Sequence, residues 1–273
     1  MSNASVLFDV PGPTAARRYR TIGRVTVVVL VSVAALVIWK LWSEDQFTAE
    51  EWEPFVTPRL MELIAVGLLD TLRAAVLAIA GAMVFGVLFG VGKLSDVAAV
   101  RWVSWLVVEF FRAVPLLLLI IFVWSMFEYP LDAIYPLVIG LILYNGAVLA
   151  EVFRAGINAV PAGQAEAAYA IGLRKSAVTR IVLLPQAVKI MLPSIISQCI
   201  VALKDTSLGY AILAPGLTVA GRAIWRDFNN YFATAVVLAL IYIVLNLLLT
   251  WLGEWVQRRY VGEARATPTE MGV

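Results

Sequence analysis

The sequence predicts an all-α, polytopic membrane protein with about six transmembrane helices. Of its 273 residues, 62% are hydrophobic and only 15% are charged, whereas a soluble domain is about 45–50% apolar and about one quarter charged. The mean hydropathy is +0.88. A helix needs about 20 apolar residues to cross the hydrocarbon layer of a bilayer. Six stretches approach or exceed this length: 25–42, 68–91, 102–127, 134–153, 187–208 and 232–255.

The first stretch, 25–42, is predicted to be a retained span rather than a cleaved signal peptide, which is the alternative. Arginines precede it, as they precede a signal peptide, but its apolar core is long and ends in Trp39, Lys40 and Trp42. A signal peptide would instead end at a cleavage site formed by small residues.

The distribution of lysine and arginine predicts the orientation of the chain. If the N-terminus is cytoplasmic, fourteen of these residues fall in inside segments and three in outside segments. Positive residues accumulate on the cytoplasmic side of membrane proteins. The sequence therefore predicts two cytoplasmic tails, 1–24 and 256–273.

Composition also excludes several functions. The chain has no histidine, which removes the commonest metal ligand and the commonest general base. Its basic residues are dispersed, so no nucleic-acid surface is predicted. The string "GVGKLS" at 90–95 is not a phosphate-binding loop, because Val87 and Leu94 stand where that motif needs glycine and Ser or Thr. Gly86 and Gly90 are instead spaced for close packing of two helices in lipid.

A polar segment at 162–187 separates two apolar stretches. Residues 164–171 favour a short helix, and Gly172 follows where a helix can end in the left-handed conformation. A second short helix is predicted to begin near Ser176, and Pro185 suits the first turn of the next span. Such a bend can dock a cytoplasmic protein or lie on lipid headgroups, and the spacing alone leaves both open.

Ionisable residues inside apolar stretches are costly, so each needs a partner or a function. They either line a path for a polar substrate or pair with one another to hold the bundle. Glu109 and Arg112 are three residues apart and can pair on one helical face, and Pro115 is expected to kink that helix. The candidates are Arg73, Glu109, Arg112, Glu151, Lys204 and Asp205.

The polar segment resembles the EAA signature of the permeases of ABC importers. It has "EAA" at 166–168, Gly172, and "VLLP" at 182–185, with Val182 where isoleucine is usual. Longer strings are similar to the polar amino acid branch: "EVFRAGINAVPAGQAEAAYAIGL", "LLPQAVKIMLPS", "LKDTSL", "VEFFRAVPLLLL" and "GLLDTLRAAVLA". The resemblance covers about residues 60–255. The string "NGAVLAE" at 145–151 departs from that branch, which puts the shape of a pocket near Val148 in doubt.

The resemblance implies a five-helix type I ABC importer core at 60–255, with one extra N-terminal span at 25–42. The loop 154–186 would be the coupling loop to a separate ATPase, which would hold the ATP and Mg, while this chain would hold no cofactor and be no enzyme. Two ATPase copies, a second permease and an extracytoplasmic substrate-binding protein would be partners. The coupling residues would be Gly163, Glu166, Ala167, Ala168, Gly172, Arg174 and Pro185.

The opening string "SVLFDVPGP" is similar to the glutamate-uptake permeases of actinobacteria, which implies glutamate as the substrate. Transport would then proceed by alternating access. An ATP-independent channel or secondary carrier is the alternative. A membrane-embedded enzyme would need clustered carboxylates or a nucleophile with its base.

Overall fold

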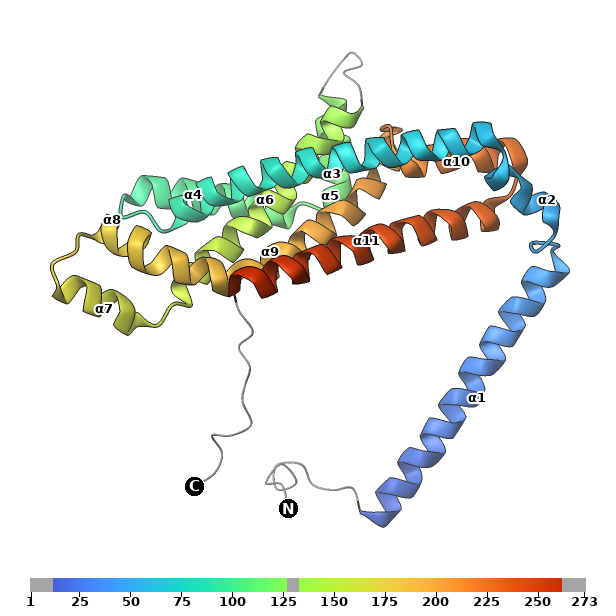
Figure 1. Cartoon of the computed structure of the whole chain (residues 1–273), viewed down its shortest axis with the longest axis horizontal. Coiled ribbons are helices and arrows are strands. Elements are labelled where there is room, and N and C mark those ends of the chain that lie inside the picture. The colour runs from blue at the N-terminus through green and yellow to red at the C-terminus, as the bar shows by residue number, and fades with distance from the viewer. Residues whose placement is uncertain (1–11, 127–132, 262–273) are drawn as a thin grey trace. The chain divides into compact units, whose positions relative to one another are not determined.

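The computed structural model describes residues 12–126 and 133–261, and these residues form helices joined by short connections (Figure 1). Five helices are long and apolar enough to cross a membrane, or six if the bent pair α4–α5 counts as one span. The expected all-helical, polytopic fold is confirmed. The chain divides into two compact units, Met1–Pro54 and Phe55–Val273.

The first unit contains the extra N-terminal span. Helix α1 (Pro13–Ser43) is followed by α2 (Ala49–Trp52) and the 3-10 turn η2 (Glu53–Val56). The helix begins well before the predicted span 25–42, and residues 13–24 form its first turns. Lys40 pairs with Glu44 at its end and holds the pKa of that carboxyl below its ordinary value.

The second unit is built around α6 (Ile134–Asn158), the most buried candidate span of the described chain. It packs against α3 (Pro58–Lys93), α4 (Ala98–Ala113), α5 (Leu116–Ser125) and α9 (Leu184–Asp205). Helix α11 (Tyr231–Val261) packs against α9 and α10 (Leu217–Phe228). Figure 1 shows α7 and α8 at one end of this unit and α10 at the other.

Glycine and alanine allow α3 and α6 to approach closely. A Cβ added at Gly90 would lie 2.9 Å from the Ala150 carbonyl oxygen, and one at Gly86 would lie 2.7 Å from Leu149 Cβ. Small residues promote helix association in lipid because packing, not water exclusion, is the driving force there. The packing role predicted for the two glycines is thus confirmed.

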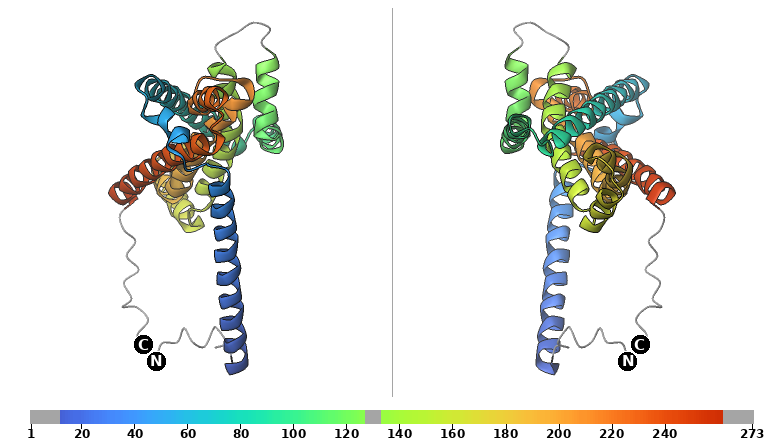
Figure 2. Two further views of the ribbon diagram at one scale, coloured as in Figure 1. Left: turned by 90° about the vertical axis from the view of Figure 1, so that its right-hand side faces the viewer. Right: turned by 90° about the vertical axis from the view of Figure 1, so that its left-hand side faces the viewer.

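The expected single span at 102–127 is broken into α4 and α5, which meet at 101° (Figure 2). A kink at Pro115 was expected, but a break of this size was not. The residue before a proline is driven to extended backbone, and Val114 has ψ 129° and ends α4. The expected end of this span, Phe127, lies outside the described residues.

The polar segment forms an elbow at one end of the second unit. Helix α7 (Ala162–Ala170) ends at Gly172, whose φ of +83° confirms the expected left-handed turn. The Gly172 N–H donates to the Tyr169 carbonyl at 2.9 Å and the Leu173 N–H to the Ala168 carbonyl at 3.2 Å. This pair of bonds is the Schellman arrangement that satisfies the last carbonyls of a helix.

The second helix of the elbow is not the separate piece that the sequence suggested. It begins with α8 (Lys175–Ala177) and runs through a widened π-helical segment, η3 (Val178–Leu183), directly into α9. Because Pro185 has no N–H, it cannot donate the helical hydrogen bond to the Ile181 carbonyl four residues earlier. The wider π-helical turn lies where this bond is missing. The span therefore extends from Lys175 to Ile212 through the 3-10 segment η4 (Thr206–Ile212).

We expect Gly90→Ala to lower the stability of the purified protein, because the added methyl group meets backbone atoms of α6 that cannot rotate away. Overpacking of this kind costs about 1–3 kcal/mol. Thermal unfolding in detergent should show a lower Tm than the matched variant Gly23→Ala, where nothing lies within 4 Å of an added Cβ. Equal Tm values would show that α3 and α6 do not depend on this contact.

Candidate functional site

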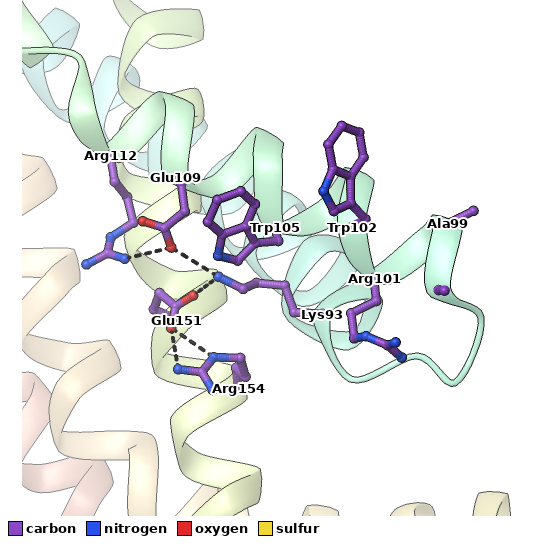
Figure 3. A pocket seen from close by; sticks show the side chains of 10 residues that line it. Lys93, Ala99, Arg101, Trp102, Trp105, Glu109, Arg112, Glu151 and Arg154 are labelled. Atoms are coloured by element: carbon purple, nitrogen blue, oxygen red, sulfur yellow. Dashed lines mark hydrogen bonds and ion pairs between the residues drawn. The ribbon is translucent and has the colours of Figure 1, made fainter.

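A cluster of charged side chains joins the ends of three helices (Figure 3). Lys93, the last residue of α3, lies between two carboxylates, Glu109 of α4 and Glu151 of α6. The Lys93 Nζ is 3.2 Å from Glu109 Oε1 and also pairs with Glu151. Its side chain is only 6% exposed. One buried ammonium thus ties α4 and α6 to α3.

Two arginines extend this cluster. Arg154 pairs with Glu151 at 2.9 Å, and Arg112 pairs with Glu109 at 3.4 Å. Both pairs span three residues along one helix, where side chains meet on the same face. The expected pair of Glu109 and Arg112 is present. Each carboxylate of the cluster therefore has two cationic partners.

The cluster lines one wall of a cavity of about 970 Å³ between α3, α4 and α6. Arg101, Trp102 and Trp105 of α4 line the rest of it. Figure 3 shows both indoles on the α4 side and Glu151 with Arg154 on the α6 side. The lining carries four cations and two carboxylates, so two positive charges are in excess.

The sequence indicated Glu109, Arg112 and Glu151 as candidates but not Lys93, which was counted among the cations of a cytoplasmic connection. The signal was present, because a lysine that ends a long span must either reach solvent or find carboxylates nearby. Only the fold shows which carboxylates approach it.

The other three ionisable candidates lie apart from this cluster. Arg73 is exposed on α3. Lys204 is exposed at the end of α9, while its neighbour Asp205 is half-buried and interacts with Asn145 of α6. Successive residues of a helix point in different directions, and among the described residues no ion pair joins Lys204 to Asp205.

A groove of about 520 Å³ surrounds Lys204 between α9 and α11. Tyr242, Asn246 and Thr250 of α11 line its far side. Asn246 donates to the Tyr242 carbonyl at 2.6 Å, while its own Oδ1 is buried and accepts no hydrogen bond from any described residue. The groove thus holds one cation, Lys204, opposite the polar side chains of α11, while the Asn246 oxygen is closed off from it. A separate polar contact, which no sequence pattern indicated, joins α9 to α6: Gln198 Nε2 donates to Asn145 Oδ1 at 2.6 Å.

The elbow presents most of the expected coupling residues on its surface. Ala168 is buried against the rest of the unit, and Gly172 forms the turn. Ile171, directly before Gly172, forms the tip of the elbow, and this apolar residue is 78% exposed. The remaining coupling residues are exposed: Gly163, Glu166, Ala167, Arg174 and Pro185.

Two contacts hold the elbow in place. Gln186 of α9 donates to Gln164 Oε1 of α7 at 3.3 Å. Lys175 of α8 pairs with Asp96, which lies in the connection between α3 and α4. That connection begins directly after Lys93, so the elbow and the charged cluster are joined through a few residues.

Among the described residues, no group of three or more His, Cys, Asp or Glu side chains could hold a metal ion.

A bundle of membrane helices with an ordered polar elbow is typical of a transport subunit that works with a partner. The family described as binding-protein-dependent transport system inner membrane component matches residues 82–262. The chain belongs to this family. It is a permease subunit of a binding-protein-dependent amino acid ABC transporter, as the resemblance implied.

Individual relatives agree with this assignment. The chain is 41% identical over 233 residues to the glutamate transport system permease protein GluD of Corynebacterium glutamicum, covering 82% of this chain and 85% of that protein. It is 31% identical over 204 residues to the arginine transport system permease protein ArtQ of Bacillus subtilis, covering 72% of this chain and 91% of that protein.

Solved structures show the same fold. A crystal structure of an amino acid ABC transporter with histidines matches with a TM-score of 0.69 and 30% identity, over 74% of this chain and 95% of that one. The inward-facing MetNI methionine ABC transporter matches with a TM-score of 0.63 at 21% identity, over 75% of this chain and 99% of that one. In this family the ATPase is a separate subunit, so hydrolysis is not a task of this chain.

We expect Lys93→Met to destabilise the protein, because Glu151, whose side chain is only 18% exposed, would keep Arg154 but lose its buried ammonium partner. The matched variant Lys40→Met removes an exposed pair, which contributes little to stability. Thermal unfolding of both variants in detergent checks the difference. Adding Glu151→Gln to Lys93→Met should recover part of the loss; no recovery would contradict the pairing.

Proposed function

We propose that this permease subunit carries L-glutamate across the plasma membrane by alternating access, driven by a separate ATPase that docks on the α7–α8 elbow. The observation that supports the elbow's role is its ordered, capped and exposed geometry at one end of a bundle that is otherwise apolar. The observation that supports glutamate is the 41% identity to a permease named for glutamate transport.

The elbow has the properties that mechanical coupling requires. A ligand must distinguish two states by about 5.5 kcal/mol to move an equilibrium from 1:99 to 99:1. A flexible segment would move without transmitting such a difference to the spans. The Schellman turn and the contacts of Gln186 and Lys175 instead hold the elbow in one conformation. In this proposal Glu166 and Arg174 contact the ATPase, Ile171 enters a groove on it, and Gly172 sets the bend.

The assembly contains two ATPase copies, a second and different permease, and an extracytoplasmic binding protein. Both termini of this chain are cytoplasmic in the proposal, which the distribution of lysine and arginine supports. The α7–α8 elbow then faces the cytoplasm, where ATP is available. The second permease closes the groove between α9 and α11 into a path.

Lys204 is the side chain we propose for substrate recognition. Its ammonium lines the groove between α9 and α11 and can hold a carboxylate. The next residue, Asp205, is half-buried and interacts with Asn145 of α6. Arg73 stays a prediction for the same path. Glu109 and Arg112 pair with each other, and Glu151 pairs with Lys93 and Arg154.

We expect unlabelled glutamate to compete with labelled glutamate uptake in cells more strongly than arginine, glutamine or methionine does. Lys204→Met should raise the KM for glutamate about tenfold, because one charge-assisted contact is lost. Lys204→Arg should retain most of the affinity, and Lys189→Met, which removes an exposed lysine elsewhere on α9, should change nothing. The KM for glutamate uptake, measured with all three variants, tests the role of Lys204. An unchanged KM in Lys204→Met would remove the residue from the path.

We expect Glu166→Lys to abolish both co-purification of the ATPase and uptake, because the reversed charge would repel its contact on that subunit. The matched variant Glu62→Lys changes an exposed glutamate of α3 and should leave both intact. A pull-down through a tag on the permease, followed by ATPase assay of the eluate, measures the effect. Normal retention of the ATPase by Glu166→Lys would refute the role of this residue.

A further inference from the structure

We propose that the cavity between α3, α4 and α6 binds the headgroup of an anionic phospholipid. This proposal does not rest on the identity of the transported amino acid. The site consists of Lys93, Arg101, Arg112 and Arg154 around the carboxylates Glu109 and Glu151, with Trp102 and Trp105 on α4 (Figure 3).

The charge balance of the cavity indicates an anionic ligand. Both carboxylates are already paired, Glu151 with Lys93 and Arg154, and Glu109 with Lys93 and Arg112. Two positive charges remain uncompensated within the lining. Excess charge at the edge of a low-dielectric layer is costly, and a phosphate diester would neutralise part of it.

Unused hydrogen-bond donors are available for a phosphate. A guanidinium has five N–H groups. Arg112 uses one nitrogen, for Glu109 at 3.4 Å. Arg101 uses Nη1 alone, for the Ser95 carbonyl at 2.8 Å and the Asp96 carbonyl at 3.5 Å. The other nitrogens of both side chains make no hydrogen bond to any described residue and can meet phosphate oxygens.

The surroundings favour a lipid over a free amino acid. Trp102 is 61% and Trp105 is 49% exposed, and exposed tryptophan is typical of the membrane–water interface. Acyl chains would cover the neighbouring exposed apolar residues of α4, Leu106 and Phe110. An amino acid zwitterion would bring an ammonium to a site whose carboxylates are already paired. Basic pockets between the ends of membrane helices are known to hold anionic headgroups.

Native mass spectrometry of the purified importer complex tests the proposal with defined lipids. Phosphatidylglycerol and phosphatidylethanolamine with identical acyl chains are added, and the bound fraction of each is measured. We expect selective retention of phosphatidylglycerol by the unaltered complex. Arg101→Gln should weaken that retention about tenfold, Arg101→Lys should retain more of it, and Arg226→Gln, an exposed arginine of α10, should leave it unchanged.

Several results would overturn the proposal. Equal retention of both lipids, or a preference that Arg101→Gln does not change, would show an unselective lipid shell. Displacement by glycerol phosphate without acyl chains would identify a site for free phosphate instead. Loss of a protein subunit from the Arg101→Gln complex would show that the cavity is a protein interface.

Discussion

The close approach of α3 and α6 is the constraint on which the rest of this fold depends. Gly90 meets the backbone of Ala150, and one helical turn further along α3 Lys93 pairs with Glu151, the residue after Ala150. The absence of a side chain at Gly90 thus brings the ammonium within reach of its carboxylate. Without that contact, Lys93 would keep Glu109 alone as its carboxylate partner, and Glu151 would lose its buried cation.

The connection between α3 and α4 contacts both the elbow and the edge of the cavity. The connection after Lys93 carries Asp96, which pairs with Lys175 of the elbow. It also supplies the Ser95 carbonyl that holds Arg101 at the edge of the cavity. A displacement of the elbow by a partner would therefore reach the end of α3 and, through it, α6. Because salt bridges between exposed groups contribute little on their own, the continuous η3–α9 helix provides the stiffer connection.

The all-helical class and most spans could be predicted from the sequence because apolar length alone defines a membrane helix. The left-handed turn at Gly172 was also predictable, since glycine alone adopts it without strain. Three features were not. The 101° break before Leu116 and the continuity of α8 with α9 depend on how neighbours accommodate a proline. Lys93 was missed because its partners are 16 and 58 residues away in the chain, and no local pattern marks them.

The account rests on the tip of the elbow touching an ATPase, and site-directed cross-linking tests this most directly. The substitution Ile171→Cys, made with Cys199→Ser so that it holds the chain's one cysteine, would place a thiol at the exposed tip. In intact cells, a membrane-permeant reagent with a maleimide at one end and a photoreactive group at the other should join the permease to the ATPase, while a membrane-impermeant maleimide should fail to label the thiol. Labelling from the outside, or no adduct with any ATPase, would contradict the account.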